Sequence, residues 1–188
     1  LALSVYDSPN RGDAKTSPER ITDNLLNLLE LGINFLRDKA GLTRTGQIDT
    51  QARDDLEIPE IALKEALANA LVHRDYENYS DQPTRIEVYP DRVEITSFGK
   101  ALVDFNQDPE DIISTQRNHS IADVFRIMQQ VELNASGISR LHYAMRKAKL
   151  PDPIIKTRSQ PDTVKVIFRR PSPSDQASSA NPDFTITE

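Results

Sequence analysis

The chain has 188 residues, which is enough for one domain with a single hydrophobic core, with or without arms. It contains no cysteine, and this excludes disulfides, cysteine-ligated metal sites and thiol catalysis. Its net charge of −6 argues against a nucleic-acid-binding surface over the whole molecule, although a local basic patch is still compatible with that charge.

The chain shows no sign of a membrane segment or a secretion signal. No apolar run approaches the roughly 18 residues that a membrane span requires, and no signal-peptide pattern opens the sequence. We therefore expect a cytoplasmic protein. Because the sequence begins at Leu1 without methionine, we also expect it to be part of a longer protein.

The first 57 residues are expected to be a linker and helix at the end of a preceding domain. Alternating apolar residues within 1–15 predict a strand followed by a linker. The capping residues of segment 16–19 predict that a helix begins there. Its apolar stripe runs from Ile21 to Leu36, and Gly41 is suited to follow its end. Segment 43–56 is polar and predicts a loop or a short hairpin.

The most informative stretch is 59–76, which predicts a buried helix. Pro59 fits the start of a helix. Apolar residues recur along the stretch at the spacing of one buried face: Leu63, Ala66, Leu67, Ala70 and Leu71. Glu65 and Asn69 are four residues apart and share one side of the helix, with His73 one turn further on. A carboxylate and an amide should therefore point in the same direction.

Segments 84–89 and 92–96 alternate apolar and polar residues around Pro90-Asp91, and they predict a β-hairpin. A short helix is expected at 108–113, a second from Ser120, and a third after Ser136, its expected N-cap. Strands are expected at 154–155 and 163–168. Segment 171–188 is rich in proline and serine and is expected to be a disordered tail.

Several common sites are excluded by their motifs. The six glycines form neither a phosphate-binding Walker loop nor a dinucleotide-binding turn. His73-Arg74-Asp75 matches the catalytic triplet of protein kinases, but the asparagine and the glycine-rich strand of those enzymes are missing. The three histidines are scattered, which argues against a histidine-ligated metal.

Glu65 and Asn69 allow two interpretations. On a helix beside a sheet, a carboxylate can activate water and an amide can hold Mg²⁺ near phosphates. Alternatively, Glu65 is a surface residue and Asn69 a hydrogen-bonded residue at the margin of a core helix. The spacing alone leaves both open.

A family resemblance favours the first interpretation. The chain resembles the RecG-like C-terminal, HATPase-type domain of bacterial transcriptional regulators, which usually follows a Schlafen-type AlbA DNA-binding domain. The residues that carry the resemblance are Glu65, Asn69-Ala70, His73 to Tyr76, Asp91 to Ile95, Gly99, Arg117-Asn118, Glu132, Gly137-Ile138 and Pro151 to Pro153. The resemblance covers roughly residues 58–170. It implies a GHKL ATPase-like fold, an α/β sandwich (α+β class) in which a mixed sheet packs on helices, here with an N-terminal helical arm.

The resemblance also implies roles for individual residues. Glu65 matches the general base and Asn69 the Mg²⁺ ligand of the GHKL helix. The cofactor ATP is implied to lie against six positions: Asn69, His73, Ser97, Gly99, Ser136 and Gly137.

Two departures from the family weaken this site. Ser97-Phe98-Gly99 replaces the Asp-x-Gly of GHKL ATPases and the Asn-Pro-Gly of the regulators, and Ala135-Ser136-Gly137 replaces Gly-Thr-Gly. The serine hydroxyl is a weaker acceptor than a carboxylate. Nucleotide binding with weak or no hydrolysis is the expectation.

The expected organisation is thus an N-terminal segment 1–57, a GHKL ATPase-like domain at 58–170 and a tail at 171–188. The domain is expected to be the regulatory part of a transcriptional regulator. That regulator is expected to contact DNA through a domain outside this chain, and a homo-oligomer is compatible with this expectation. The alternative is a non-catalytic dimerisation or DNA-positioning module with a degenerate nucleotide pocket. A third hypothesis, a helix-turn-helix at 120–149 with Arg140, Arg146 and Lys147 on phosphates, competes with a solvated basic face.

Overall fold

The computed structural model describes residues 1–11, 18–38, 57–113, 115–128 and 137–170. These residues form one six-stranded sheet with the order β2-β1-β3-β4-β6-β5. The strands are β1 (Ala2–Val5), β2 (Glu19–Arg20), β3 (Arg85–Val88), β4 (Arg92–Phe98), β5 (Ile154–Arg158) and β6 (Thr163–Arg169). The helices are α1 (Leu25–Asp38), α2 (Glu60–Val72), α3 (His119–Ile127) and α4 (Gly137–Lys147).

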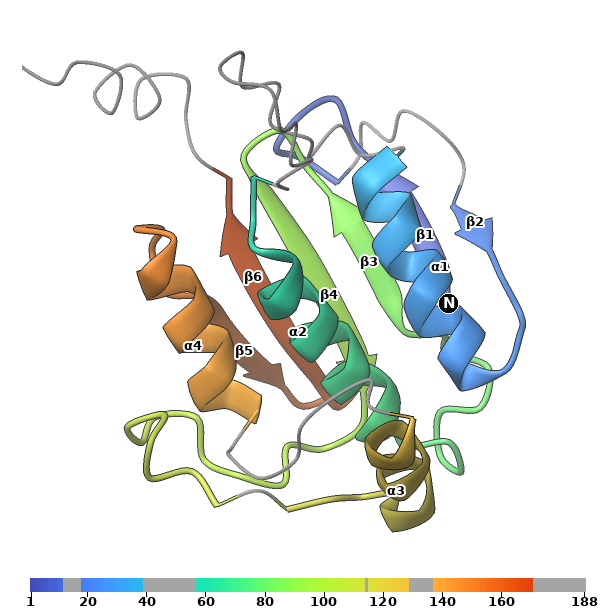
Figure 1. The fold of residues 1–188 in the computed structure, drawn as a ribbon. Helices are drawn as coiled ribbons and strands as arrows, with labels where there is room; N and C mark the ends of the chain where they lie inside the picture. The colour runs from blue at the N-terminus through green and yellow to red at the C-terminus, as the bar shows by residue number, and fades with distance from the viewer. Residues whose placement is uncertain (12–17, 39–56, 114, 129–136, 171–188) are drawn as a thin grey trace, which may run out of the picture.

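The elements form two layers, a sheet and the helices that cover one of its faces. Figure 1 shows α1, α2 and α4 across the same face of the sheet, with α3 at one end. β1 runs parallel to β3 and the other neighbouring strands are antiparallel, so the sheet is mixed. The predicted fold class, a mixed sheet packed on helices, is confirmed.

α2 is the central helix and is buried on almost every side. It packs against α1, α4 and the sheet, which explains why a helix with so few polar residues is stable here. Its fully buried residues include Leu63 and Leu67. The helix ends at Val72, earlier than predicted, because the chain turns back to the sheet, where the Asp75 N–H donates to the Phe98 carbonyl at 2.8 Å.

The predicted β-hairpin is confirmed. In the β3–β4 register, Ile86 opposes Ile95 on the helix side of the sheet, and Glu87 opposes Glu94 on the other side. β6 pairs antiparallel with β4, and β5 forms the edge. The alternation seen in the sequence therefore separates an apolar face under the helices from a polar face.

The first helix begins later than the capping residues at 16–19 predicted. Glu19 and Arg20 pair with β1 as a short strand instead. The true cap is Asn24, whose Oδ1 accepts a hydrogen bond from the Asn27 N–H at 3.0 Å. Gly41 and segment 43–56 lie outside the described residues.

The expected boundary at residue 57 does not separate two units within the described residues. β1 lies inside the sheet between β2 and β3, and α1 packs against α2. Leu3 and Leu29 belong to the same hydrophobic core as Leu67 and Phe168. The N-terminal segment is therefore part of the helix layer and sheet and not an arm. Segment 171–188 lies outside the described residues.

The later elements follow the prediction with one exception. α3, α4, β5 and β6 lie where the sequence placed them. Segment 108–113 forms a turn and not a helix, because the Asp108 side chain accepts from the Glu110 N–H and its carbonyl from the Asp111 N–H. None of the helices in the described ranges has the length and apolar character needed to cross a bilayer.

The tight contact of α1 with α2 and the sheet gives a test of the fold. A Cβ added at Gly32 would lie 2.5 Å from Leu67 Cδ2 and 3.0 Å from Ile86 Cδ1. Gly32→Val should therefore lower the free energy of unfolding by roughly 1–3 kcal/mol through overpacking. Thermal and urea unfolding measure this, with Leu31→Val, on the exposed side of the same helix, as the control. An unchanged stability of Gly32→Val would contradict the packing described here.

Candidate nucleotide site

A cavity of about 110 Å³ lies between α2, α4 and the central strands. Five of the predicted ligand-binding residues line it: Asn69, His73, Ser97, Gly99 and Gly137. They come from three separate parts of the chain, which the fold brings together. Glu65, one helical turn before Asn69 on α2, does not line the cavity. Ser136 is outside the described residues.

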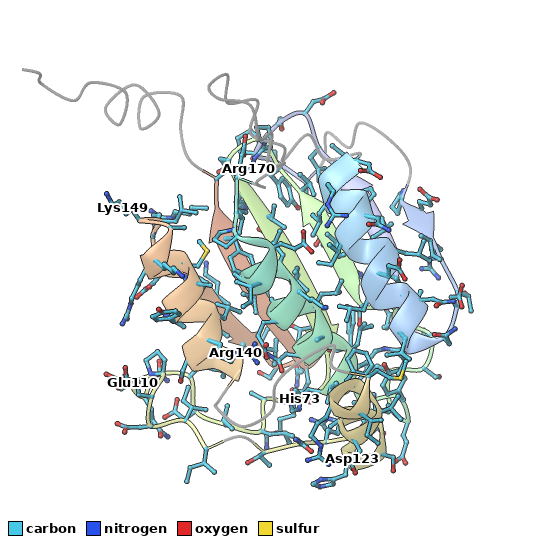
Figure 2. The ribbon with its side chains drawn as sticks, viewed as in Figure 1. His73, Glu110, Asp123, Arg140, Lys149 and Arg170 are labelled. Carbon is cyan, nitrogen blue, oxygen red and sulfur yellow. The ribbon has the colours of Figure 1, made fainter. Side chains whose placement is uncertain are left out.

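Glu65 and Asn69 form a buried pair on α2. Glu65 is only 2% exposed, so its interpretation as a surface residue is wrong. Its Oε1 accepts a hydrogen bond from Asn69 Nδ2 at 3.2 Å, and its Oε2 lies 3.6 Å from Arg140 Nη1. Figure 2 shows Arg140 on the side of α4 that faces α2. The arginine compensates the buried negative charge.

The orientation of the Asn69 amide matters for ligand binding. Its nitrogen is turned toward Glu65, so its oxygen points away from that carboxylate. Asn69 also lines the cavity. An amide oxygen is a suitable ligand for a hard cation such as Mg²⁺.

Gly137, the first residue of α4, lies directly against this pair. A Cβ at this position would lie 2.1 Å from Glu65 Oε1 and 2.9 Å from Asn69 Nδ2. No larger residue fits without moving α4, the Glu65 side chain, or both. The glycine therefore lets the start of α4 approach the acid and the amide.

Ser97 and Gly99 end β4 at the cavity. The Ser97 hydroxyl donates to the Ala70 carbonyl at 2.6 Å, which fixes the strand to α2 and leaves the oxygen able to accept. Gly99 has a φ of +133°, and a Cβ there would lie 2.9 Å from Asp75 Cβ. Only glycine combines this backbone conformation with this close approach.

His73 lies just after α2 and lines the cavity as a neutral imidazole. Burial, together with the nearby Arg117 guanidinium, lowers the pKa of His73 to about 4. The side chain is therefore uncharged at neutral pH. It offers the cavity a hydrogen-bonding group without a positive charge.

Two residues that hold the end of α2 had no predicted role. The Asn118 amide donates to the carbonyls of Val72 and Arg74 at 2.7 and 2.8 Å, and Arg117 Nε donates to the His73 carbonyl at 3.0 Å. The last carbonyls of a helix have no partner within the helix, so these side chains cap it. Arg117-Asn118 was part of the family resemblance, but spacing gave no indication that it lies beside residues 72–74.

The triplet His73-Arg74-Asp75 has a structural role and not a kinase role. The Arg74 guanidinium donates to the carbonyls of Gln82 and Tyr79 at 3.0 and 2.6 Å and stacks on the Tyr76 ring. These bonds hold the turn between α2 and β3.

The loop 100–113 covers the cavity, which the sequence did not indicate. Its apolar side chains line the cavity: Leu102, Val103, Phe105 and Ile112. Ile112 is 5% exposed, and the Ser139 hydroxyl of α4 donates to the Pro109 carbonyl at 2.7 Å. An irregular loop has no periodic pattern, and for this reason its contribution to the cavity could not be predicted.

Residues 81–168 match the protein family described as "Putative ATP-dependent DNA helicase recG C-terminal". This stretch is similar to the RecG-like C-terminal, HATPase-type domain. The match extends from just before β3 to β6 and includes Ser97, Gly99 and Gly137. It begins after α2, so Glu65 and Asn69 are outside the matched segment. The family resemblance predicted from the sequence is confirmed for the matched stretch.

The fold of the chain is similar to that in the crystal structure of the DIP2311 protein from Corynebacterium diphtheriae, with a TM-score of 0.73 and 21% sequence identity. The similarity covers 92% of this chain and 35% of that protein, so the chain spans about a third of its length. At this identity the likeness concerns the fold. Comparison with curated proteins gives no match.

The cap at the end of α2 gives a second test. Asn118→Ala removes the donor of two backbone carbonyls and should destabilise the chain by roughly 1–3 kcal/mol. Urea unfolding measures the change. Asn106→Ala, whose amide donates only to the exposed Asp104, is the control and should change stability by less than about 0.5 kcal/mol. Equal effects of the two substitutions would contradict a capping role.

The depressed pKa of His73 gives a third test, in the pH dependence of stability. Between the unfolded pKa near 6.5 and the folded value of about 4, only the unfolded chain binds the proton, so stability falls as the pH falls through this range. His73→Asn should remove up to about 3 kcal/mol of the loss between pH 6.5 and 4. His119→Asn, at an exposed position, is the control. Superimposable pH profiles of wild type and His73→Asn would show that burial does not affect the titration of His73.

Proposed function

We propose that this chain is the nucleotide-binding regulatory domain of a transcriptional regulator, and that it binds ATP with Mg²⁺ and hydrolyses it weakly or not at all. The observation that supports the proposal is the cavity itself. Asn69 and His73 from α2, Ser97 and Gly99 from β4, and Gly137 from α4 all line it. The RecG-like, HATPase-type family match supports an adenine nucleotide as the ligand.

The apolar end of the cavity suits the adenine ring. Ile95, Val164 and Val166 line this end together with Ser97 and the buried Gly99, and Ser97 offers a hydroxyl oxygen. At about 110 Å³ the cavity is somewhat smaller than the roughly 150 Å³ that accommodates a benzene molecule. Entry of the base therefore requires the loop 100–113 to move, and its packing energy reduces the affinity.

Magnesium would be held by Asn69 together with the phosphates of the nucleotide. Within the described ranges, no group of three His, Cys, Asp or Glu side chains is placed to bind a metal ion, so the site fits an ion that arrives with its phosphates. Bound Mg²⁺ supplies charge neutralisation for the triphosphate. The N–H groups at the start of α4, beside Gly137, are suited to the same phosphates.

Glu65 is the proposed general base, and its environment explains weak hydrolysis. Its two oxygens already contact Asn69 and Arg140. To orient an attacking water, Glu65 must give up one of these contacts. The base is therefore present but restrained, and we expect nucleotide binding to be the functional event.

The regulator as a whole is proposed to act in the cytoplasm, to contact DNA through a domain outside this chain, and to form a homo-oligomer. A second candidate function is a non-catalytic dimerisation or DNA-positioning module. The bond of Ser97 to the Ala70 carbonyl favours it, because the position that holds a carboxylate in GHKL ATPases is here used to fix β4 to α2.

Calorimetric titration of the chain with ATP, with and without Mg²⁺, tests the proposal. We expect binding that Mg²⁺ strengthens, and Asn69→Ala should reduce this strengthening at least tenfold because it removes the metal ligand. Glu65→Gln should retain binding and lose residual phosphate release. Asn27→Ala on the exposed side of α1 is the matched control. Absence of heat at millimolar nucleotide would reject nucleotide binding and leave the second candidate.

A further inference from the structure

The face of the sheet that the helices leave uncovered carries an unusual charge distribution. Figure 1 shows the labelled helices on one side of the sheet only. The strand registers place seven cationic side chains on the opposite face: Arg20, Arg85, Arg92, Lys156, Arg158, Lys165 and Arg169. The same strands place only two carboxylates there, Glu87 and Glu94. This face is strongly basic in a chain whose net charge is −6.

Both carboxylates are buried and neutralised by neighbours. Glu87 accepts from the Tyr6 hydroxyl at 3.1 Å and from Arg11 Nη2 at 3.0 Å. Glu94 is paired with Arg92, at 2.7 Å, and with Lys165. These contacts place the negative charges at the bottom of the face, beneath the cationic side chains.

Four of the cations have no intramolecular partner among the described residues. Lys156 and Arg158 on β5, Arg169 on β6 and Arg20 on β2 are exposed, and their side chains make no ion pair or hydrogen bond within the described ranges. Lys156 and Arg158 are two residues apart on β5, and like charges this close repel one another and are usually separated or paired. Their arrangement is therefore suited to an external anion.

A buried hydroxyl on the same face also lacks a partner. Thr96 is 5% exposed, and its Oγ1 has no hydrogen bond in the described part of the molecule. Through the strand registers it lies in one row with Arg85, Lys165 and Lys156.

We propose that this face, the sheet's basic face, binds double-helical DNA through its phosphates, independently of nucleotide and of any other DNA-binding domain. On β5, Lys156 and Arg158 are two residues apart, which is about 6.8 Å and equals the rise of two base pairs along the axis of a DNA duplex. Lys165 lies beside Lys156 across the ladder. The three cations thus present a short charged track.

The aromatic residues of the face favour a duplex over a single strand. Single-strand binders stack bases on exposed aromatic rings. Here Tyr6, Tyr89 and Phe98 are 7%, 2% and 3% exposed, and two of them are covered by the guanidinium groups of Arg92 and Arg85. Contacts with the phosphates are therefore available, and base stacking is not.

Fluorescence anisotropy of the full 188-residue chain with a 20-base-pair duplex, over a series of salt concentrations, tests the proposal. Four phosphate contacts predict a slope of log K against log salt of about −3.6. The double variant K156E/R158E should lose two of these contacts, which brings the slope to about −1.8 and weakens binding roughly 60-fold at 0.1 M salt. Should that variant fail to unfold cooperatively, R20Q/R169Q replaces it with the same expected change in slope.

The matched control is K147E/K149E, which changes the net charge by the same amount at the last residue of α4 and two residues beyond it. Lys149 lies at the end of this helix that is remote from the Arg140 region (Figure 2). We expect the control to bind the duplex like the wild type. Equal loss in both variants, or loss only in K147E/K149E, would overturn the proposal, and the latter would favour α4 as the DNA-binding helix.

Three other results would also overturn it. These are no binding to the duplex at 50 mM salt, equal or tighter binding of the single strand of the same sequence, and binding to anionic lipid vesicles without binding to the duplex. A failure here leaves the nucleotide titration unaffected, because the sheet's basic face lies on the opposite side of the sheet from the cavity.

Discussion

The close approach of α4 to α2 is the constraint on which the candidate site depends. It is possible only because position 137 has no side chain, since a Cβ there would lie 2.1 Å from the Glu65 carboxylate. The contact buries an acid, an amide and the start of a helix together. Arg140, one turn further along α4, compensates the charge of the acid. The same contact that places Asn69 at the cavity thus also holds the Glu65 carboxylate between Asn69 and Arg140.

The end of α2 is fixed by a second set of contacts, which explains how a cavity is kept between a helix and a sheet. Ser97 bonds to Ala70, Asp75 bonds to Phe98, and Asn118 caps the last carbonyls of the helix. Each of these bonds joins α2 or the turn that follows it to a segment distant in sequence. Gly99 permits the closest of these approaches through its positive φ. The geometry of the cavity is therefore a property of tertiary contacts rather than of one motif.

The sequence predicted the elements with strong local patterns and missed those that depend on distant partners. α2, the β3–β4 hairpin and β6 have clear apolar periodicity, and all were found. The residues before α1 have good capping chemistry at 16–19, yet Glu19 and Arg20 pair with β1. The domain boundary expected at 57 is not observed for a similar reason, because β1 pairs in parallel with β3, more than 80 residues away.

Within the site, the acid and amide of α2 were predictable from their spacing, and Gly99 and Gly137 from the family resemblance. The burial of Glu65, its contact with Arg140 and the loop over the cavity could not be predicted, since none has a periodic signal.

The two faces of the sheet have separate chemistry, with the cavity proposed to bind nucleotide under the helices and basic side chains on the other side. The central claim concerns the cavity, and a crystal structure of the chain with Mg²⁺ and a non-hydrolysable ATP analogue tests it most directly. The account predicts the adenine ring in the enlarged cavity beside Ser97 and Gly99, with Mg²⁺ bound to the Asn69 oxygen. A nucleotide bound elsewhere, with the loop 100–113 still packed over a cavity of about 110 Å³, would contradict it.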